Sequence, residues 1–137
     1  MSAHSNLKAA YMSTVFEWSG ALPDEFIIIT ACNPHGRNAP SSRNAHQNET
    51  LRAVLVSRGL TPVAVVGRSP SGDHREPSWA VPLSVEAALP LARLFKQDAI
   101  YSVRGDELAV VSTRAGEPPA ALGSWAARRV SAAGDPA

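Results

Sequence analysis

The chain has 137 residues, of which 45% are hydrophobic and 18% are charged, a length and balance typical of one folded domain. Its single cysteine, Cys32, excludes an internal disulfide and is typical of a reducing compartment. The net charge of +1, with only two lysines, argues against a nucleic-acid partner.

The charge is unevenly distributed along the chain. Residues 36–76 contain six arginines and three acidic residues, so this stretch has a net charge of +3, whereas the remainder has −2. Three of the four histidines, His35, His46 and His74, lie within or beside the same stretch. The sequence therefore predicts one local, arginine-lined site rather than a charged surface.

Membrane and targeting segments are not visible. No apolar run approaches the roughly 20 residues that a membrane span requires. The first residues are polar and lack the apolar core of a secretory signal. We therefore expect a cytoplasmic protein without a membrane partner.

The first predicted elements are a short helix and two strands. Ser5 can cap a helix whose apolar edge holds Leu7, Ala10 and Tyr11. Residues 14–18 and 26–31 are β-branched or aromatic runs separated by turn formers, which predicts a hairpin. The unbroken isoleucines at residues 27–29 predict that the second strand is central and covered on both faces.

A loop, a long helix and a third strand follow. Residues 32–42 are dense in turn formers. A helix is predicted from Ser42 or Asn44 to Arg58, with Gly59 as a left-handed cap. Residues 63–67 form the next apolar strand, and the order strand, helix, strand predicts a right-handed parallel crossover.

Four more elements are predicted in the second half of the chain, before its composition changes after Thr113. A polar loop over residues 68–77 precedes a strand over 78–81, a helix over 84–95 and a closing hairpin of residues 99–103 and 107–112. Pro90 predicts a kink or an irregular first turn in that helix. After Thr113 the sequence is rich in alanine, proline, glycine and arginine. We therefore assign residues 1–113 to one domain and 114–137 to a mobile tail, from which Trp125 can dock.

These elements predict an α+β fold. A mixed sheet of five or six strands is expected to form a two-layer sandwich with two main helices, mostly on one face.

The polar loop after the central strand is the most suggestive candidate site. Asn33 and Arg37 lie in this loop, and Ser42, Asn44 and Asn48 lie at the start of the following helix. The second polar loop, which contains Glu76, belongs to the same candidate site. A helix N-terminus offers free amide groups to an anion, and arginines bind phosphate or carboxylate. The pattern therefore predicts a small anionic ligand. Alternatively, Ser42 and Asn44 are ordinary helix caps and Asn48 braces the loop backbone.

Two further groups of residues have possible chemistry. Glu76 can act as a general base with His74 as its proton partner, or both can belong to a solvated turn. Cys32 with His35 has the residue types of a nucleophilic pair or a zinc site, but the spacing matches no strong template. A cysteine that ends an apolar strand is usually a small buried hydrophobe. We therefore expect neither a metal nor a cofactor.

Four segments together point to a known family. They are Thr30-Ala31-Cys32-Asn33-Pro34-His35-Gly36, the helix start with Asn44, Asn48 and Leu51, the stretch from Gly72 to Ser78, and Phe95-Lys96-Gln97-Asp98-Ala99-Ile100. In this combination the chain resembles the domain of unknown function 3293 family of small bacterial proteins, over residues 11–112. The polar residues that match are Asn33, Asn44, Asn48, Glu76, Ser78 and Gln97. The resemblance implies that Ser78 and Gln97 belong with the candidate site, but it implies no activity, because the family has no established ligand or reaction.

Three functional hypotheses follow. The first is a binding domain for a small anionic or nucleotide-like metabolite, in which Asn48→Ala removes ligand-induced stabilisation without unfolding the protein. The second is a protein interaction module without a small ligand, which could form a homodimer through an apolar patch. The third is a hydrolase or transferase that uses Glu76, so the sequence does not decide whether the chain is an enzyme.

Overall fold

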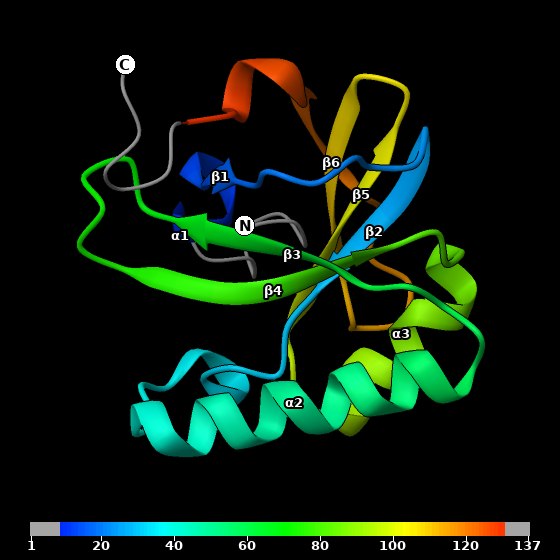
Figure 1. The fold of residues 1–137 in the computed structure, drawn as a ribbon. Helices are drawn as coiled ribbons and strands as arrows, with labels where there is room; N and C mark the ends of the chain where they lie inside the picture. The colour runs from blue at the N-terminus through cyan, green and yellow to red at the C-terminus, as the bar shows by residue number, and fades with distance from the viewer. Residues whose placement is uncertain (1–8, 131–137) are drawn as a thin grey trace.

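Seven strands form one antiparallel sheet in the computed structural model, which describes residues 9–130 (Figure 1). The strands are β1 (Val15–Glu17), β2 (Glu25–Ile29), β3 (Val63–Arg68), β4 (Arg75–Val81), β5 (Ala99–Arg104), β6 (Glu107–Ser112) and β7 (Ala120–Ser124). The helices are α1 (Ala9–Ser13), α2 (Ser41–Ser57) and α3 (Val85–Leu94), with the 3₁₀ turns η2 (Pro34–Gly36) and η3 (Ala126–Arg128). The predicted cap Ser5 and its neighbour Leu7 lie outside the described residues. No helix within residues 9–130 is long and apolar enough to cross a membrane.

The strand order is β1-β3-β4-β2-β5-β6-β7, and each neighbouring pair is antiparallel. The α+β class is therefore confirmed, but the predicted mixed sheet of five or six strands is wrong in its pairing and has too few strands. The predicted parallel crossover joins β2 and β3, but these strands are not neighbours. β2 and β3 run in the same direction, yet β4 folds back between them and pairs with both. The order strand, helix, strand predicted that β2 and β3 run in the same direction, but it did not predict which strands are neighbours.

The predicted hairpin of β1 with β2 is wrong as well, because β1 pairs with β3. The connection over residues 18–24 crosses the ends of two strands. Its length permits this, since strands lie about 5 Å apart and an extended residue spans about 3.3 Å. The turn formers predicted the reversal of the chain, but they contain no information on the partner strand.

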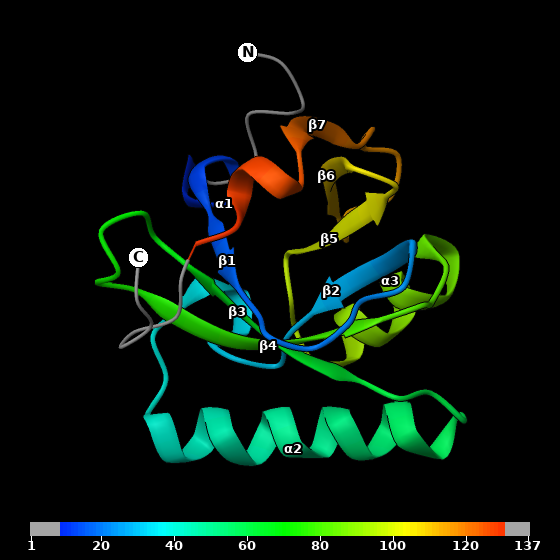
Figure 2. The same ribbon diagram turned by 45° about the horizontal axis from the view of Figure 1, so that its top comes forward.

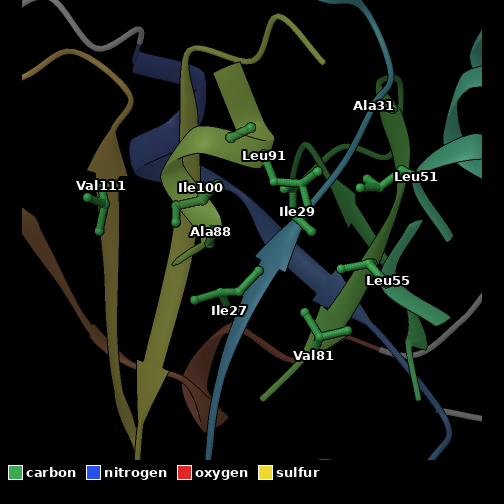
Figure 3. Packing of buried hydrophobic residues seen from close by; sticks show 11 residues of the cluster. Ile27, Ile29, Ala31, Leu51, Leu55, Val81, Ala88, Leu91, Ile100 and Val111 are labelled. Carbon is green, nitrogen blue, oxygen red and sulfur yellow. The ribbon is translucent and has the colours of Figure 1, made fainter. Parts of the chain in front are cut away.

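Both main helices, α2 and α3, pack on one face of the sheet, as predicted (Figure 2). Ile27 and Ile29 of β2 belong to this layer, where they pack with Leu51 and Leu55 of α2 and with Leu91 of α3 (Figure 3). The apolar seam of α2 therefore meets the central strand. This packing fixes the start of α2 beside the loop that follows β2.

Two local predictions are confirmed, the end of α2 and the closing hairpin. α2 is followed by Gly59 at a φ of 81°, a left-handed conformation that glycine adopts without strain. β5 and β6 form the closing hairpin with Gly105 in its turn. β4 is longer than predicted, because its first residues pair with β3 and place Glu76 opposite Gly67. Pro90 lies inside α3, which is continuous from Val85 to Leu94.

The opposite face of the sheet curls around a second apolar cluster (Figure 2). Its buried members are Phe16, Phe26, Ile28, Val65, Ala80, Val103, Leu108 and Trp125. Beyond β7 the chain returns to the first strand: Arg129 forms a parallel bridge with Phe16, and the Val130 N–H donates to the Phe16 carbonyl at 2.9 Å. This segment joins the two edges of the sheet, which has the shape of a half-barrel.

The region assigned to a tail takes part in this closure as far as residue 130. β7 pairs with β6. Trp125 is only 7% exposed and packs against Phe16, Trp18 and Phe26. The amino-acid composition did not predict β7, because alanine, glycine and serine are weak β formers and the strand depends on its pairing with β6. Residues 131–137 of the predicted tail lie outside the described residues.

Candidate functional site

A pocket with a volume of about 230 Å³ opens on the curled face of the sheet, opposite α2 and α3. It lies at the end of the sheet where β2 and β3 finish and where β4 and β5 begin; α1 lies beside this end (Figure 1). Alternate residues of a strand share one face, so five neighbouring strands contribute to one concave floor. The strands and the residue that follows β2 contribute these lining residues: Phe16, Ile28, Thr30, Gly67, Glu76, Ser78, Ala99 and Tyr101.

One wall of the pocket is aromatic. Tyr11, Phe16 and Tyr101 line it, and the Tyr101 ring lies 6.1 Å from the Tyr11 ring and 5.0 Å from the Phe16 ring, centre to centre. The Tyr101 hydroxyl donates to Thr14 Oγ1 at 2.9 Å. Burial is the largest cause that raises the pKa of both tyrosine hydroxyl groups. The wall is therefore an uncharged aromatic surface whose ring positions are fixed by mutual contacts.

Glu76 is the carboxylate on the pocket floor. Its Oε2 atom accepts a hydrogen bond from Asn33 Nδ2 at 3.1 Å and lies 3.6 Å from His74 Nε2. Within residues 9–130 its Oε1 atom accepts no hydrogen bond. Burial raises the pKa of Glu76, and the Asn33 hydrogen bond and His74 partly oppose that effect. The side chain is half-buried and is held through one oxygen, and no described residue engages the other.

Asn33 and Asn44 brace the loop after β2. Asn33 has a left-handed backbone with a φ of 50°, which asparagine tolerates better than most residues. Its Oδ1 atom accepts hydrogen bonds from Asn44 Nδ2 at 2.8 Å and from the Ala39 N–H at 3.0 Å. Asn44 Oδ1 in turn accepts from the Asn33 N–H at 2.9 Å. Asn33 thus links the loop to Glu76, whereas Asn44 serves the loop alone.

Asn48 joins the same loop to β4. Its Oδ1 atom accepts a hydrogen bond from the Ala31 N–H at 3.1 Å, and its Nδ2 atom donates to the Pro77 carbonyl at 3.2 Å. The side chain is buried and does not line the pocket. These contacts favour the bracing role for Asn48 over direct contact with a ligand.

Ser78 and Gln97 also line the pocket. Ser78 Oγ donates to the Glu76 backbone carbonyl at 3.1 Å. Gln97 Nε2 donates to the carbonyls of Cys32 at 3.0 Å and Phe95 at 3.2 Å, which ties the end of α3 to the loop after β2. The Ser78 hydroxyl and the Gln97 side-chain amide therefore donate to backbone carbonyls beside the pocket.

Of the residues predicted for ligand binding or catalysis, the structure brings one group together. Asn33, His74, Glu76, Ser78 and Gln97 line the pocket. The others do not line it: Arg37 and Ser42 are exposed, and Asn44 and Asn48 brace the backbone beside it. The N-terminus of α2, where an anion was expected, is thus separate from the pocket.

The two arginines nearest to Glu76 in the paired strands are engaged on the far side of the sheet. Arg75 donates to both carboxylate oxygens of Glu17, at 2.6 and 2.8 Å, and Arg68 Nε lies 2.8 Å from Glu17 Oε2. Along β4, Ala80 belongs to the cluster of the curled face and Val81 to the cluster beneath the helices. By alternation Glu76 shares the face of Ala80, whereas Arg75 points to the opposite face.

This ion cluster predicts acid-sensitive stability. Glu17 is buried, and the hydrogen bonds from Arg75 are the largest cause that lowers its pKa. A carboxyl group with a lowered folded-state pKa stabilises the fold above its unfolded-state pKa, and this contribution is lost as pH falls through the folded-state pKa. We expect Glu17→Gln to reduce the free energy of unfolding by about 1–3 kcal/mol at neutral pH.

Urea unfolding of both proteins across pH checks this prediction. The stability difference between them is expected to shrink as pH falls below the ordinary glutamate range, because unmodified Glu17 then also becomes uncharged. Glu25→Gln is the matched control, since Glu25 pairs with Arg104 at an exposed site, and such pairs add little stability. A Glu17→Gln difference that stays constant from neutral to acidic pH would contradict the electrostatic explanation.

Three non-glycine residues have positive φ: Asn33, which lines the pocket, and His35 and Lys96, which directly precede the lining residues Gly36 and Gln97. They are the only ones within residues 9–130, and the His35 N–H donates to the Lys96 carbonyl at 2.7 Å. His35 Nδ1 also lies 3.1 Å from Asp98 Oδ1. Each such residue costs about 1–3 kcal/mol, and strained residues cluster at functional sites. Their position supports the pocket as the functional site.

Cys32 has the environment of a small buried hydrophobe. It is 2% exposed, and burial raises the pKa of its thiol. Its Sγ atom lies 3.5 Å from the Pro77 carbonyl oxygen, and none of the histidines proposed as partners contacts it. In the part of the chain that the structure describes, no three His, Cys, Asp or Glu residues are grouped to hold a metal ion.

Sequence reasoning did not include the aromatic wall in the site. Tyr11, Phe16 and Tyr101 sit in apolar patterns that are indistinguishable from core positions. It also named no binding residue among residues 67–69, although Gly67, Arg68 and Ser69 line the pocket. One feature of the sequence could have identified this wall. Successive residues of 26–30 and of 99–103 point to opposite faces of their strands, and this alternation places Ile28 and Tyr101 on the face away from the helices.

Comparison with known proteins gives one match. The model of the family described as "Protein of unknown function (DUF3293)" matches residues 29–100, which is more than half of the chain. The match includes the last residue of β2, all of α2, β3, β4 and α3, and all five predicted residues that line the pocket. Searches of curated proteins and of solved structures give no match.

Proposed function

The chain belongs to the DUF3293 family of proteins of unknown function, and from the pocket itself we propose that the domain binds a small organic molecule on the concave face of its sheet. One observation supports this proposal most strongly: three aromatic rings and Glu76 line the same pocket, and no described residue engages one of the Glu76 carboxylate oxygens. Small-molecule sites are usually concave and largely apolar, with a few polar groups that orient the ligand. The positive φ of Asn33, which lines the pocket, and of His35, which precedes the lining residue Gly36, adds support.

The interaction module has less support. The large apolar side chains exposed within residues 9–130 are Met12, Val56 and Leu94, on three different helices. Leu94 lies beside Arg43 near the start of α2, whereas Val56 lies near its end. The helical rise separates these positions by about 20 Å. Such single residues are ordinary on a protein surface and do not form an interaction patch.

An enzyme that uses Glu76 is the second candidate. Glu76 faces the pocket with a raised pKa and His74 beside it, which are features of general acid and base groups. A hydrolase or transferase with a covalent intermediate also needs an activated nucleophile. In the described part of the chain, neither the Glu76 carboxylate nor His74 Nε2 is hydrogen-bonded to a serine or cysteine side chain. Binding is therefore the better-supported function.

Gly67 offers a test that fills the pocket without changing a polar group. A Cβ atom there would lie 3.5 Å from Thr14 Cγ2 and 3.7 Å from Phe16 Cε1, which are ordinary contacts. We expect at least one of three probes of similar size, benzylamine, benzyl alcohol and benzoate, to bind with a Kd of about 0.1–1 mM. Binding is measured by shifts of the backbone amide NMR signals of Ile28, Glu76 and Tyr101, and Gly67→Leu is expected to abolish those shifts.

Ala64→Leu is the matched control, because Ala64 lies on the same strand and is exposed. It adds the same side chain and is expected to leave the probe shifts unchanged. Equal shifts in Gly67→Leu and in the unmodified protein would refute binding in this pocket, as would the absence of saturable shifts with all three probes.

A further inference from the structure

We propose that the ligand of this pocket is an organic cation in which an ammonium group is attached to a ring or a short apolar body. This inference rests on the ligand-binding function proposed above and names the chemical class of the ligand. The ammonium group donates a hydrogen bond to Glu76 Oε1, and the apolar body lies against Tyr11, Phe16 and Tyr101.

The acidic groups at the pocket favour a cation. Glu76 lies on the floor, and Asp98 lies close enough to the wall that its charge, with that of Glu76, adds to burial in raising the pKa of Tyr11. The imidazole of His74 is beside Oε2 of Glu76, and that of His35 is beside Asp98. The remaining oxygen, Glu76 Oε1, offers a charge-assisted hydrogen bond to an incoming donor.

The arginines at or near the pocket have partners elsewhere. Arg68 lines the pocket, but its Nε atom pairs with Glu17, as does Arg75 on the far face of the sheet. Arg128, whose charge acts on Tyr101, donates to the backbone carbonyls of Met12, Thr14 and Leu122 at 3.0–3.1 Å. Arg75 and Arg128 are therefore engaged away from the pocket, whereas a cation meets an oxygen of Glu76 that no described residue engages.

The aromatic wall suits the same ligand. Aromatic rings attract a cation through the negative charge on their faces, and the attraction is strongest when the cation leaves water. The Tyr101 and Phe16 rings are held edge to face at 86°, so this part of the wall exists before the ligand arrives. Carboxylate and rings together select an ammonium group over a hydroxyl or carboxylate group of the same size.

The three benzyl probes test this selection, because they share a ring and differ in charge. At neutral pH we expect benzylamine to bind about tenfold more tightly than benzyl alcohol, and benzoate to bind most weakly. Glu76→Gln keeps the shape of the side chain and is expected to bring the affinity for benzylamine within about twofold of that for benzyl alcohol. Glu86→Gln removes an equal charge from an exposed site on α3 and is expected to preserve the preference.

The outcomes separate this inference from the proposed function. If benzyl alcohol or benzoate binds as tightly as benzylamine and Gly67→Leu still abolishes binding, the cation proposal is wrong. The proposal that the pocket binds a small organic molecule is then retained. A preference that survives Glu76→Gln would also overturn the proposal. If Glu76→Gln does not fold, Tyr11→Leu replaces it. This variant keeps an apolar surface, and we expect it to weaken benzylamine binding about threefold and to leave benzyl alcohol binding unchanged.

Discussion

Trp125→Ala is expected to reduce the free energy of unfolding by about 3–5 kcal/mol, because it opens a cavity in a fully formed apolar cluster. The Trp125 ring lies 4.5 Å from the Trp18 ring in a stacked arrangement, and 4.9 Å from the Phe16 ring. Its backbone N–H donates to the Asp106 carbonyl at 2.7 Å. The substitution therefore weakens both the cluster and the segment that joins β7 to β1.

Chemical denaturation followed by far-ultraviolet circular dichroism measures this loss without relying on tryptophan fluorescence. Trp18→Ala is the matched control, since Trp18 is only partly buried and stacks on the outer side of Trp125. We expect it to cost about 1–2 kcal/mol. A loss below about 1 kcal/mol for Trp125→Ala would show that this segment contributes little to the fold, which is what a mobile tail predicts.

Local patterns predicted the elements well, because their signals lie within a few residues. Gly59 marked the end of α2, and Gly105 marked the turn of the closing hairpin. The sheet order was not predictable in this way. The partners of β1 and β4 are chosen by contacts between distant segments, such as Phe16 with Gly67 and Trp79 with Ile29. The strand β7 was missed for the same reason, since its partner β6, rather than its own composition, stabilises it.

The candidate site was predicted in part. Asn33 and Glu76 were placed in one site from two polar loops, and they share a hydrogen bond across 43 positions of the chain. The arginine count that predicted an anion does not show which face of a strand an arginine occupies or which acid neutralises it. Glu17, which engages Arg75 at a separation of 58 residues, had no local signal. The register of strand pairing decides which face of the sheet each strand residue occupies, and the sequence alone did not determine that register.

Asn48→Ala is the other substitution with a large expected effect, a loss of about 2–4 kcal/mol in the free energy of unfolding. The buried Asn48 side chain accepts from the Ala31 N–H and donates to the Pro77 carbonyl. Alanine leaves the Ala31 N–H without this partner, and an unsatisfied buried group costs about 1–3 kcal/mol. This expectation reverses the earlier one, in which the variant lost ligand binding but not stability.

A double-mutant cycle with Thr30→Val makes the test specific. Thr30 Oγ1 also donates to the Pro77 carbonyl, at 2.7 Å, so each single variant leaves that carbonyl with the other donor. Removing both donors leaves only the weak Cys32 Sγ contact. We therefore expect the double variant to lose about 0.5–2 kcal/mol more than the two single losses combined, measured by urea unfolding. Additive losses would show that the two side chains do not share this carbonyl. An Asn48→Ala protein that keeps its stability but no longer binds benzylamine would instead identify Asn48 as a ligand contact.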